Sequence, residues 1–228
     1  MKSKKLIMIA LFVLANVLGF NALAHAGTLV MNFDDEIDSD GDPPSGTPPW
    51  LIATITDNGT DAVLMTIQST LQSTDESIRR LWFNTSDDVD ANNLTITQRE
   101  GGPTALSINS QQDGFGGTSG MGHSILGFDI QLKWTEHAFA NSDVVQFDIS
   151  GSGLTAESFN FKNNGGDFHF FSVAKIAGVA DRNNEHNGQP HDELIAPTGV
   201  PLPATLFLGA LGLIALPLLV NRWGHMTA

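Results

Sequence analysis

Residues 50–56 read WLIATIT, residues 57–60 read DNGT, and residues 62–68 read AVLMTIQ. Both outer runs are rich in apolar and β-branched residues, which favour strands. An Asn-Gly pair between two such runs is the strongest short-range signal for a β-hairpin, because a type I′ turn needs positive φ at both central residues. The stretch therefore predicts an antiparallel hairpin with Asn58 and Gly59 at its turn.

Short runs of the same kind recur along the chain and are separated by turn-forming residues. No long pattern with the 3.6-residue period of a helix occurs between the two apolar ends of the chain. The expected fold is all-β, a single β-sandwich of the Ig-like or jelly-roll kind over residues 27–179. A polar, flexible linker or stalk is expected at residues 180–199. The other expected strands are residues 28–33, 78–84, 94–98, 105–109, 124–134, 144–150, 158–161 and 167–176, with a glycine-rich loop at 113–122.

The composition of residues 27–196 suits one exported domain with a core of its own. This span holds all 25 Asp and Glu of the chain but only seven of its 11 Lys and Arg, a net charge of −18. Nucleic acid is not expected as a partner, because phosphate contacts need clustered cations. The chain contains no cysteine, so the domain has to be stable without disulfides.

The first 26 residues have the three parts of a secretory signal peptide. Met1-Lys2-Ser3-Lys4-Lys5 is a positive segment, residues 6–20 are apolar, and Ala24-His25-Ala26 forms an Ala-x-Ala cleavage site. The sequence therefore predicts export, removal of residues 1–26, and a mature chain that begins at Gly27.

The last 29 residues begin with Val200-Pro201-Leu202-Pro203-Ala204, continue into an apolar stretch and end shortly after Arg222. A transmembrane helix is expected at residues 205–220. Counted from Val200 to Val220, a helix would be about 31 Å long at ~1.5 Å per residue, enough to cross a hydrocarbon core of ~30 Å. Arg222 agrees with the positive-inside bias, which leaves the chain end in the cytoplasm. An ordinary single-pass anchor is one interpretation of this stretch.

The order of these parts resembles the PEP-CTERM sorting signal in its VPLPA variant. The chain differs from that family at its basic end, where Arg222 stands nearly alone. The resemblance implies that residues 200–228 are recognised by an exosortase, a membrane-embedded cysteine protease, and that the membrane anchor is transient. It further implies a final place at the cell surface or in the exopolysaccharide matrix of a Gram-negative bacterium, where such proteins are linked to biofilm or floc formation. Residues 128–130 and 154–159 also look like segments of PEP-CTERM ectodomains that carry no known activity.

Alternating carboxylates at Asp38, Asp40 and Asp42 are the best candidate metal ligands, because calcium loops use this spacing. An EF-hand that begins at Asp38 would need Gly at position 43 and Glu at position 49. Both positions are Pro, so an EF-hand is excluded. A calcium site completed by another loop and a plain acidic surface loop both remain open. The same two interpretations apply to a second acidic loop at Asp87, Asp88 and Asp90.

No catalytic residue is predicted, because the chain has no cysteine, no G-x-S-x-G elbow and no H-E-x-x-H motif. The three tryptophans of the domain, Trp50, Trp82 and Trp134, are interpreted as core residues. The sequence thus predicts a non-enzymatic, exported surface or matrix protein with no cofactor other than an optional calcium ion. A calcium-assisted carbohydrate-binding module, a secreted hydrolase and a GPI-anchored protein are the alternatives, and Arg222 together with the Pro-Leu-Pro segment counts against the last.

Overall fold

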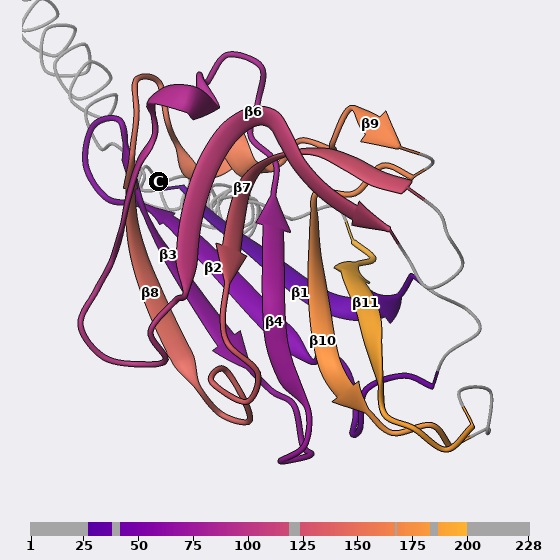
Figure 1. Ribbon diagram of the computed structural model, residues 1–228. Coiled ribbons are helices and arrows are strands. Elements are labelled where there is room, and N and C mark those ends of the chain that lie inside the picture. The colour runs from indigo at the N-terminus through magenta and orange to yellow at the C-terminus, as the bar shows by residue number, and fades with distance from the viewer. Residues whose placement is uncertain (1–26, 38–41, 119–123, 167, 183–186, 200–228) are drawn as a thin grey trace, which may run out of the picture.

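The computed structural model describes residues 27–37, 42–118, 124–166, 168–182 and 187–199 (Figure 1). Within these residues the regular elements are strands and two short 3₁₀-helices, so the expected all-β class is confirmed. In chain order they are β1 (Thr28–Glu36), β2 (Leu51–Asp57), β3 (Ala62–Ser69), β4 (Ser77–Phe83), η2 (Ala91–Asn93), β5 (Thr95–Gln98), β6 (Ser107–Thr118), β7 (Ser124–Lys133), β8 (Val144–Ser150), η3 (Ala156–Phe159), β9 (Gly165–Gly166), β10 (Ser172–Val179) and β11 (His191–Pro197).

All these strands belong to one sheet with the order β5-β8-β3-β2-β1-β11-β10-β4-β7-β6, and β9 pairs with β7. Every described ladder is antiparallel. Figure 1 shows that the sheet curls, so that β2 and β1 run behind β4 while β6 and β7 arch across the front of the view. The inner faces of both halves meet in a single hydrophobic cluster, which includes Met65 and Phe147 from one half and Leu81 and Ile130 from the other. The fold is therefore one continuous sheet curled around one core.

The pleat of the strands separates inner from outer side chains, because successive residues of a strand point to opposite faces. In β3, Val63, Met65 and Ile67 are fully buried while the residues between them are half-buried. At the end of β7, Trp134 packs against Phe139 and Phe147 with ring centroids 4.8 and 6.4 Å apart. The interpretation of the three domain tryptophans as buried residues is confirmed, since each is at most 5% exposed.

The expected stalk at residues 180–199 is wrong for its second half. β11 lies inside the sheet, paired with β1 on one side and β10 on the other, and its Ile195 is fully buried. Leu194-Ile195-Ala196 is a short apolar run among polar residues. The composition of the whole segment therefore did not indicate a strand. The domain therefore extends to Pro197, and β11 is an integral part of the sheet.

The predicted hairpin between β2 and β3 is present, with Asp57 opposite Val63. Its turn differs from the expected two-residue type I′ turn. Positive φ occurs at Gly59 (101°) and Asp61 (56°) instead of at Asn58 and Gly59, and Asn58 N donates to the Ala62 carbonyl. Asp57 still belongs to the β2–β3 ladder and β3 begins at Ala62, so the connection consists of the four residues 58–61.

Two other local expectations are corrected. Residues 113–118 of the expected glycine-rich loop form the second half of β6. Gly116 suits this strand because a Cβ there would lie 2.2 Å from the Ile125 carbonyl oxygen of β7. The expected strand at residues 158–161 is absent, and its first residues belong to η3.

The ends of the chain lie outside the described residues, and with them the expected signal peptide (1–26) and sorting signal (200–228). Ala24, Ala26, Val200, Pro201, Leu202, Pro203, Ala204 and Arg222 are all in these two ranges. Among the described residues no helix is long and apolar enough to cross a membrane.

Candidate functional site

Three cations lie side by side on the outer face of the sheet, one on each of three neighbouring strands. Arg80 of β4 is directly opposite Lys133 of β7 and, on its other side, directly opposite Lys175 of β10. Adjacent strands are ~4.8 Å apart, so the row crosses three strands at about that interval. We call Lys133, Arg80 and Lys175 the cation row.

The cation row is unusual because like charges directly opposite each other in a ladder are destabilising. Lys175 is the member with a described counter-ion, since its Nζ lies 2.7 Å from Asp192 Oδ2. Arg80 and Lys133 form no ion pair with any residue that the structure describes. Two cations of the row are therefore available to an anion from outside.

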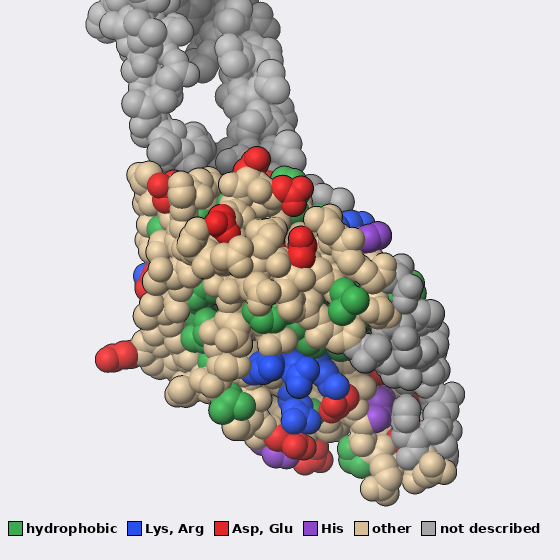
Figure 2. All heavy atoms as spheres, turned by 45° about the horizontal axis from the view of Figure 1, so that its top comes forward, with side chains coloured by type: hydrophobic (Ala, Val, Ile, Leu, Met, Phe, Trp, Pro, Cys, Tyr) green, Lys and Arg blue, Asp and Glu red, His purple; other side chains and the backbone are tan. Residues whose placement is uncertain are grey.

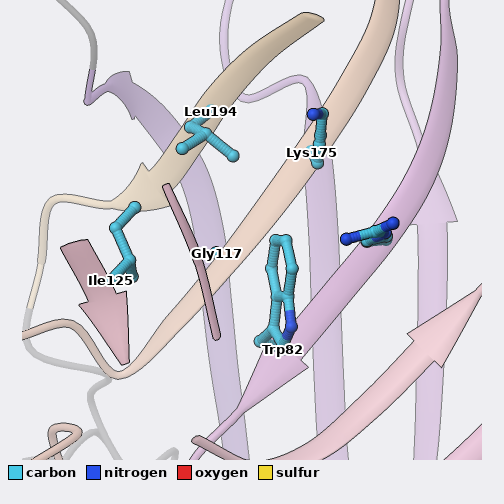
Figure 3. A pocket seen from close by; sticks show the side chains of 6 residues that line it. Trp82, Gly117, Ile125, Lys175 and Leu194 are labelled. Atoms are coloured by element: carbon cyan, nitrogen blue, oxygen red, sulfur yellow. The ribbon is translucent and has the colours of Figure 1, made fainter. Parts of the chain in front are cut away.

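A hollow of about 160 Å³ adjoins the cation row. It is lined by Arg80 and Lys175 together with Trp82, Gly117, Ile125 and Leu194. Figure 3 shows Ile125 and Leu194 on one side of the hollow and Trp82 on the other, with Gly117 between them. Ligand pockets for whole small molecules usually measure roughly 300–1,000 Å³, so this hollow suits one sugar unit or one acidic group of a longer chain.

A second hydrophobic cluster holds the apolar side of the hollow in place. The first residues of β7 and the glycines of β6 fold over the outer face, where Ile125 and Phe128 pack with Trp82 and Val173. Trp82 is 3% exposed, and its indole N–H has no hydrogen-bond partner among the described residues. The hollow is bordered by the six-membered ring of Trp82, since a Cβ at Gly117 would lie 3.6 Å from its Cη2.

The surface around the hollow agrees with this arrangement. Figure 2 shows Lys and Arg side chains gathered in one patch, bordered by hydrophobic side chains on one side and by Asp and Glu side chains on another, on a molecule whose net charge is −14. A concentration of positive charge against such a background attracts anions locally, although the molecule as a whole repels them.

A second, more open hollow of about 230 Å³ lies at Gln98, Arg99 and the residues that follow them. Its cation is already engaged, since Arg99 Nε and Nη2 donate to the two carboxylate oxygens of Asp148 at 2.8 and 2.7 Å. The hydrogen bond from Arg99 lowers the pKa of Asp148. With its charge neutralised inside the protein, this hollow is the weaker candidate.

The candidate calcium ligands are only partly covered by the structure. Asp38 and Asp40 lie outside the described residues. Asp42 is buried, and its carboxylate accepts a hydrogen bond from Arg182 N, while Arg182 Nη2 donates to the Pro43 carbonyl at 2.7 Å. No group of three or more His, Asp or Glu residues arranged for a metal ion occurs in the part of the chain that the structure describes.

The second acidic loop lies near a buried carboxylate that the sequence did not single out. Asp129 is fully buried and accepts three hydrogen bonds of 2.8 Å, from Thr85 N, Thr85 Oγ1 and Asp113 N. Partial burial, followed by the negative charges of Asp129 and Asp87, raises the pKa of the Asp113 carboxyl above its ordinary value of 3.8. These contacts give Asp129 a structural role in joining β7 to β6 and to the end of β4.

Sequence reasoning missed the cation row, because its members lie on three strands that are far apart in the chain. The argument that clustered cations are absent holds along the sequence but fails on the sheet surface. The signal that could have found the row is a cation on the outward-facing side of each of three strands, once their pairing is known. No family model, curated protein or solved structure matches this chain.

Proposed function

We propose that this chain is an exported, non-enzymatic protein of the surface or extracellular matrix of a Gram-negative bacterium, retained there by binding acidic exopolysaccharide. The signal-peptide pattern of residues 1–26 supports export. The resemblance of residues 200–228 to the PEP-CTERM signal supports a transient inner-membrane anchor and processing by an exosortase. We also propose that the curled sheet be classed as a sandwich of the Ig-like or jelly-roll kind.

The end of the described fold supports processing at the VPLPA segment. β11 ends at Pro197, three positions before Val200, and Thr198 still donates two hydrogen bonds to Asp34. Cleavage at residues 200–204 would therefore remove the apolar tail and leave every strand of the sheet in place.

The cation row carries the proposal for the ligand. Three cations spaced by the strand separation match a linear polyanion whose carboxylates repeat at about the length of one sugar unit. Charge-assisted hydrogen bonds from Lys and Arg to carboxylates are about twice as strong as neutral ones. The hollow beside Trp82 would accept one sugar face, since aromatic and aliphatic surfaces pack against the C–H groups of sugar rings. The expected ligand is a uronate-containing polysaccharide.

Calorimetric titration with sodium polygalacturonate tests this proposal, with neutral dextran as the matched polymer. We expect binding of the polyuronate alone, weakened at least tenfold when the salt concentration rises from 50 mM to 500 mM. The triple variant Lys133→Gln, Arg80→Gln, Lys175→Gln should lose binding. Lys162→Gln, which removes a cation that lies over the Phe171 ring elsewhere, should keep it. Equal binding by the triple variant would refute the site.

A calcium-assisted carbohydrate-binding module is the second candidate, with Asp38, Asp40 and Asp42 as ligands. It predicts that a chelator lowers the melting temperature and abolishes polysaccharide binding. The polyuronate site proposed above predicts no effect of the chelator. The third candidate, a secreted hydrolase, would require turnover of the polysaccharide that a single Asp, Glu or His substitution abolishes.

The export and sorting steps are tested by the intact mass of the protein recovered from membrane and medium fractions. A species that begins at Gly27, ends near residues 200–204 and is enriched outside the membrane would agree with the proposal. A membrane species that retains residues 206–228 would make the tail a permanent anchor. Replacement of Pro201 and Pro203 by Ala should leave export intact and block the loss of the tail.

A further inference from the structure

Gly27, the first described residue, lies against the carboxylate of Asp57. Gly27 N donates to Asp57 Oδ2 at 2.7 Å, and Asp57 N donates back to the Gly27 carbonyl at 2.9 Å. The second carboxylate oxygen, Oδ1, accepts from Ala156 N at 2.6 Å at the start of η3. Asp57 therefore holds three segments together: the start of β1, the end of β2 and η3.

Only glycine fits at position 27 without a shift of its neighbour. A Cβ there would lie 2.9 Å from Asp57 Oδ2 and 3.8 Å from the Ala156 Cβ. A side chain at residue 27 would therefore displace the carboxylate oxygen that the residue 27 nitrogen contacts. Asp57 itself is held in place by its two backbone partners, so its carboxylate is already oriented toward residue 27.

We propose that Asp57 is a binding site for the new N-terminus that signal-peptide removal creates at Gly27. Hydrolysis of the Ala26–Gly27 bond transfers the hydroxyl of water to the Ala26 carbonyl carbon. The signal peptide then leaves with Ala26 as its C-terminal carboxylate. The Gly27 nitrogen gains protons and becomes an ammonium group. The neutral amide hydrogen bond to Asp57 then becomes an ion pair within the same geometry, which is the stronger kind of hydrogen bond. The inference rests on the proposed export and on cleavage before Gly27.

This site couples processing to the stability of the domain. In the precursor, Gly27 offers Asp57 one polar N–H without charge. In the mature protein it offers a full positive charge to a carboxylate that also accepts a hydrogen bond from Ala156 N at the start of η3. The mature form should therefore be more stable than any form that carries residues before Gly27, even though the sheet is unchanged.

The test compares melting temperatures of the exported mature protein and of a form that retains Ala26, each with Asp57 and with Asp57→Asn. Retaining Ala26 keeps the Gly27 N–H but moves the ammonium one residue away. We expect the mature protein to melt about 3–6 °C higher than the Ala26-retaining form at low salt. Asp57→Asn should lower the melting temperature of the mature protein by more than that of the Ala26-retaining form.

Asp61→Asn is the matched control, because Asp61 is an exposed aspartate of the connection that follows Asp57 and also accepts from a backbone amide, Gly153 N, at 3.0 Å. It should affect both forms equally. A second readout is the reaction of the N-terminal amine with an amine-selective aldehyde, which should be slow in the mature protein and faster in its Asp57→Asn variant. Equal effects of Asp57→Asn on both forms, or equal reaction rates, would refute the site. An intact mass that starts elsewhere than Gly27 would instead refute the cleavage position, so the two failures are distinguishable.

Discussion

Arg80 of β4 lies between Lys133 of β7 and Lys175 of β10, directly opposite each of them in its ladder. Asp192 forms an ion pair with Lys175. Arg80 and Lys133 form no ion pair with any residue that the structure describes. A fold selected for stability alone has no reason to place three like charges in one row. We propose that an anionic ligand neutralises the row.

Removal of the central cation should stabilise the unliganded protein. We expect Arg80→Gln to raise the free energy of unfolding by about 0.2–1 kcal/mol at low salt, because it removes two direct like-charge pairs. Denaturant unfolding at 20 mM and 500 mM salt measures this. The gain should shrink at high salt, where the repulsion is screened. A loss of stability at low salt would contradict the repulsion, and Lys162→Gln serves as the control for removing one positive charge.

Filling the hollow should weaken polysaccharide binding without changing any charge. A Cβ at Gly117 would meet Trp82 Cη2 at 3.6 Å, an ordinary contact, so Gly117→Ala should fold normally. Gly117→Val extends further into the hollow and should weaken polyuronate binding about tenfold, which corresponds to ~1.4 kcal/mol. The salt dependence of binding should stay as in the unsubstituted protein, because the cation row is intact. Unchanged affinity of a folded Gly117→Val protein would show that the hollow takes no part.

Asp113→Asn should stabilise the protein at neutral pH. The raised pKa of Asp113 means that the folded state binds its proton more tightly than the unfolded state does. Stability therefore falls as the pH rises from 3.8 through the raised folded pKa, and the penalty is present above that folded pKa. Asparagine removes the charge and tolerates the positive φ of 50° at this residue. The melting temperature of the variant should be higher than that of the unsubstituted protein at pH 7. The two melting temperatures should be equal well below pH 3.8. If the two proteins differ in melting temperature by the same amount at both pH values, the raised pKa of Asp113 would be contradicted.

Loss of the buried carboxylate of Asp129 should destabilise the domain strongly. Asp129→Ala leaves the N–H and hydroxyl of Thr85 and the N–H of Asp113 without their acceptor. We expect a loss of about 3 kcal/mol or more in the free energy of unfolding, measured by urea titration. Asp148→Asn is the matched control on the exposed surface and should change stability much less, because solvent screens the pair with Arg99. Similar effects of the two variants would contradict the structural role of Asp129.

Truncation should separate the strand β11 from the tail that follows it. A chain that ends at residue 199 keeps both partners of β11 and should show one cooperative unfolding transition. A chain that ends at residue 190 loses the strand between β1 and β10 and should fail to fold, with no cooperative transition by circular dichroism. Cooperative folding of the shorter chain would restore the interpretation of residues 180–199 as a stalk.

Local pattern alone determined much of the secondary structure. The alternation in residues 62–68 and the Asn-Gly pair predicted the β2–β3 hairpin, and residues 144–150 were expected as the strand that β8 forms. Apolar and polar residues alternate along the sequence wherever one face of a strand is buried, because successive side chains point to opposite faces. The signals at residues 1–26 and 200–228 can likewise be read from the sequence, and they remain predictions.

Tertiary structure alone decided the register, and with it the candidate site. Arg80, Lys133 and Lys175 come together only because β4 pairs with β7 and with β10 at one particular alignment. β11 was missed for the same reason. Its apolar run is too short to stand out, and its place is determined by the unpaired edges that β1 and β10 offer. Pairing between distant strands depends on the summed packing of the whole core, and a sequence window contains only one side of each pair.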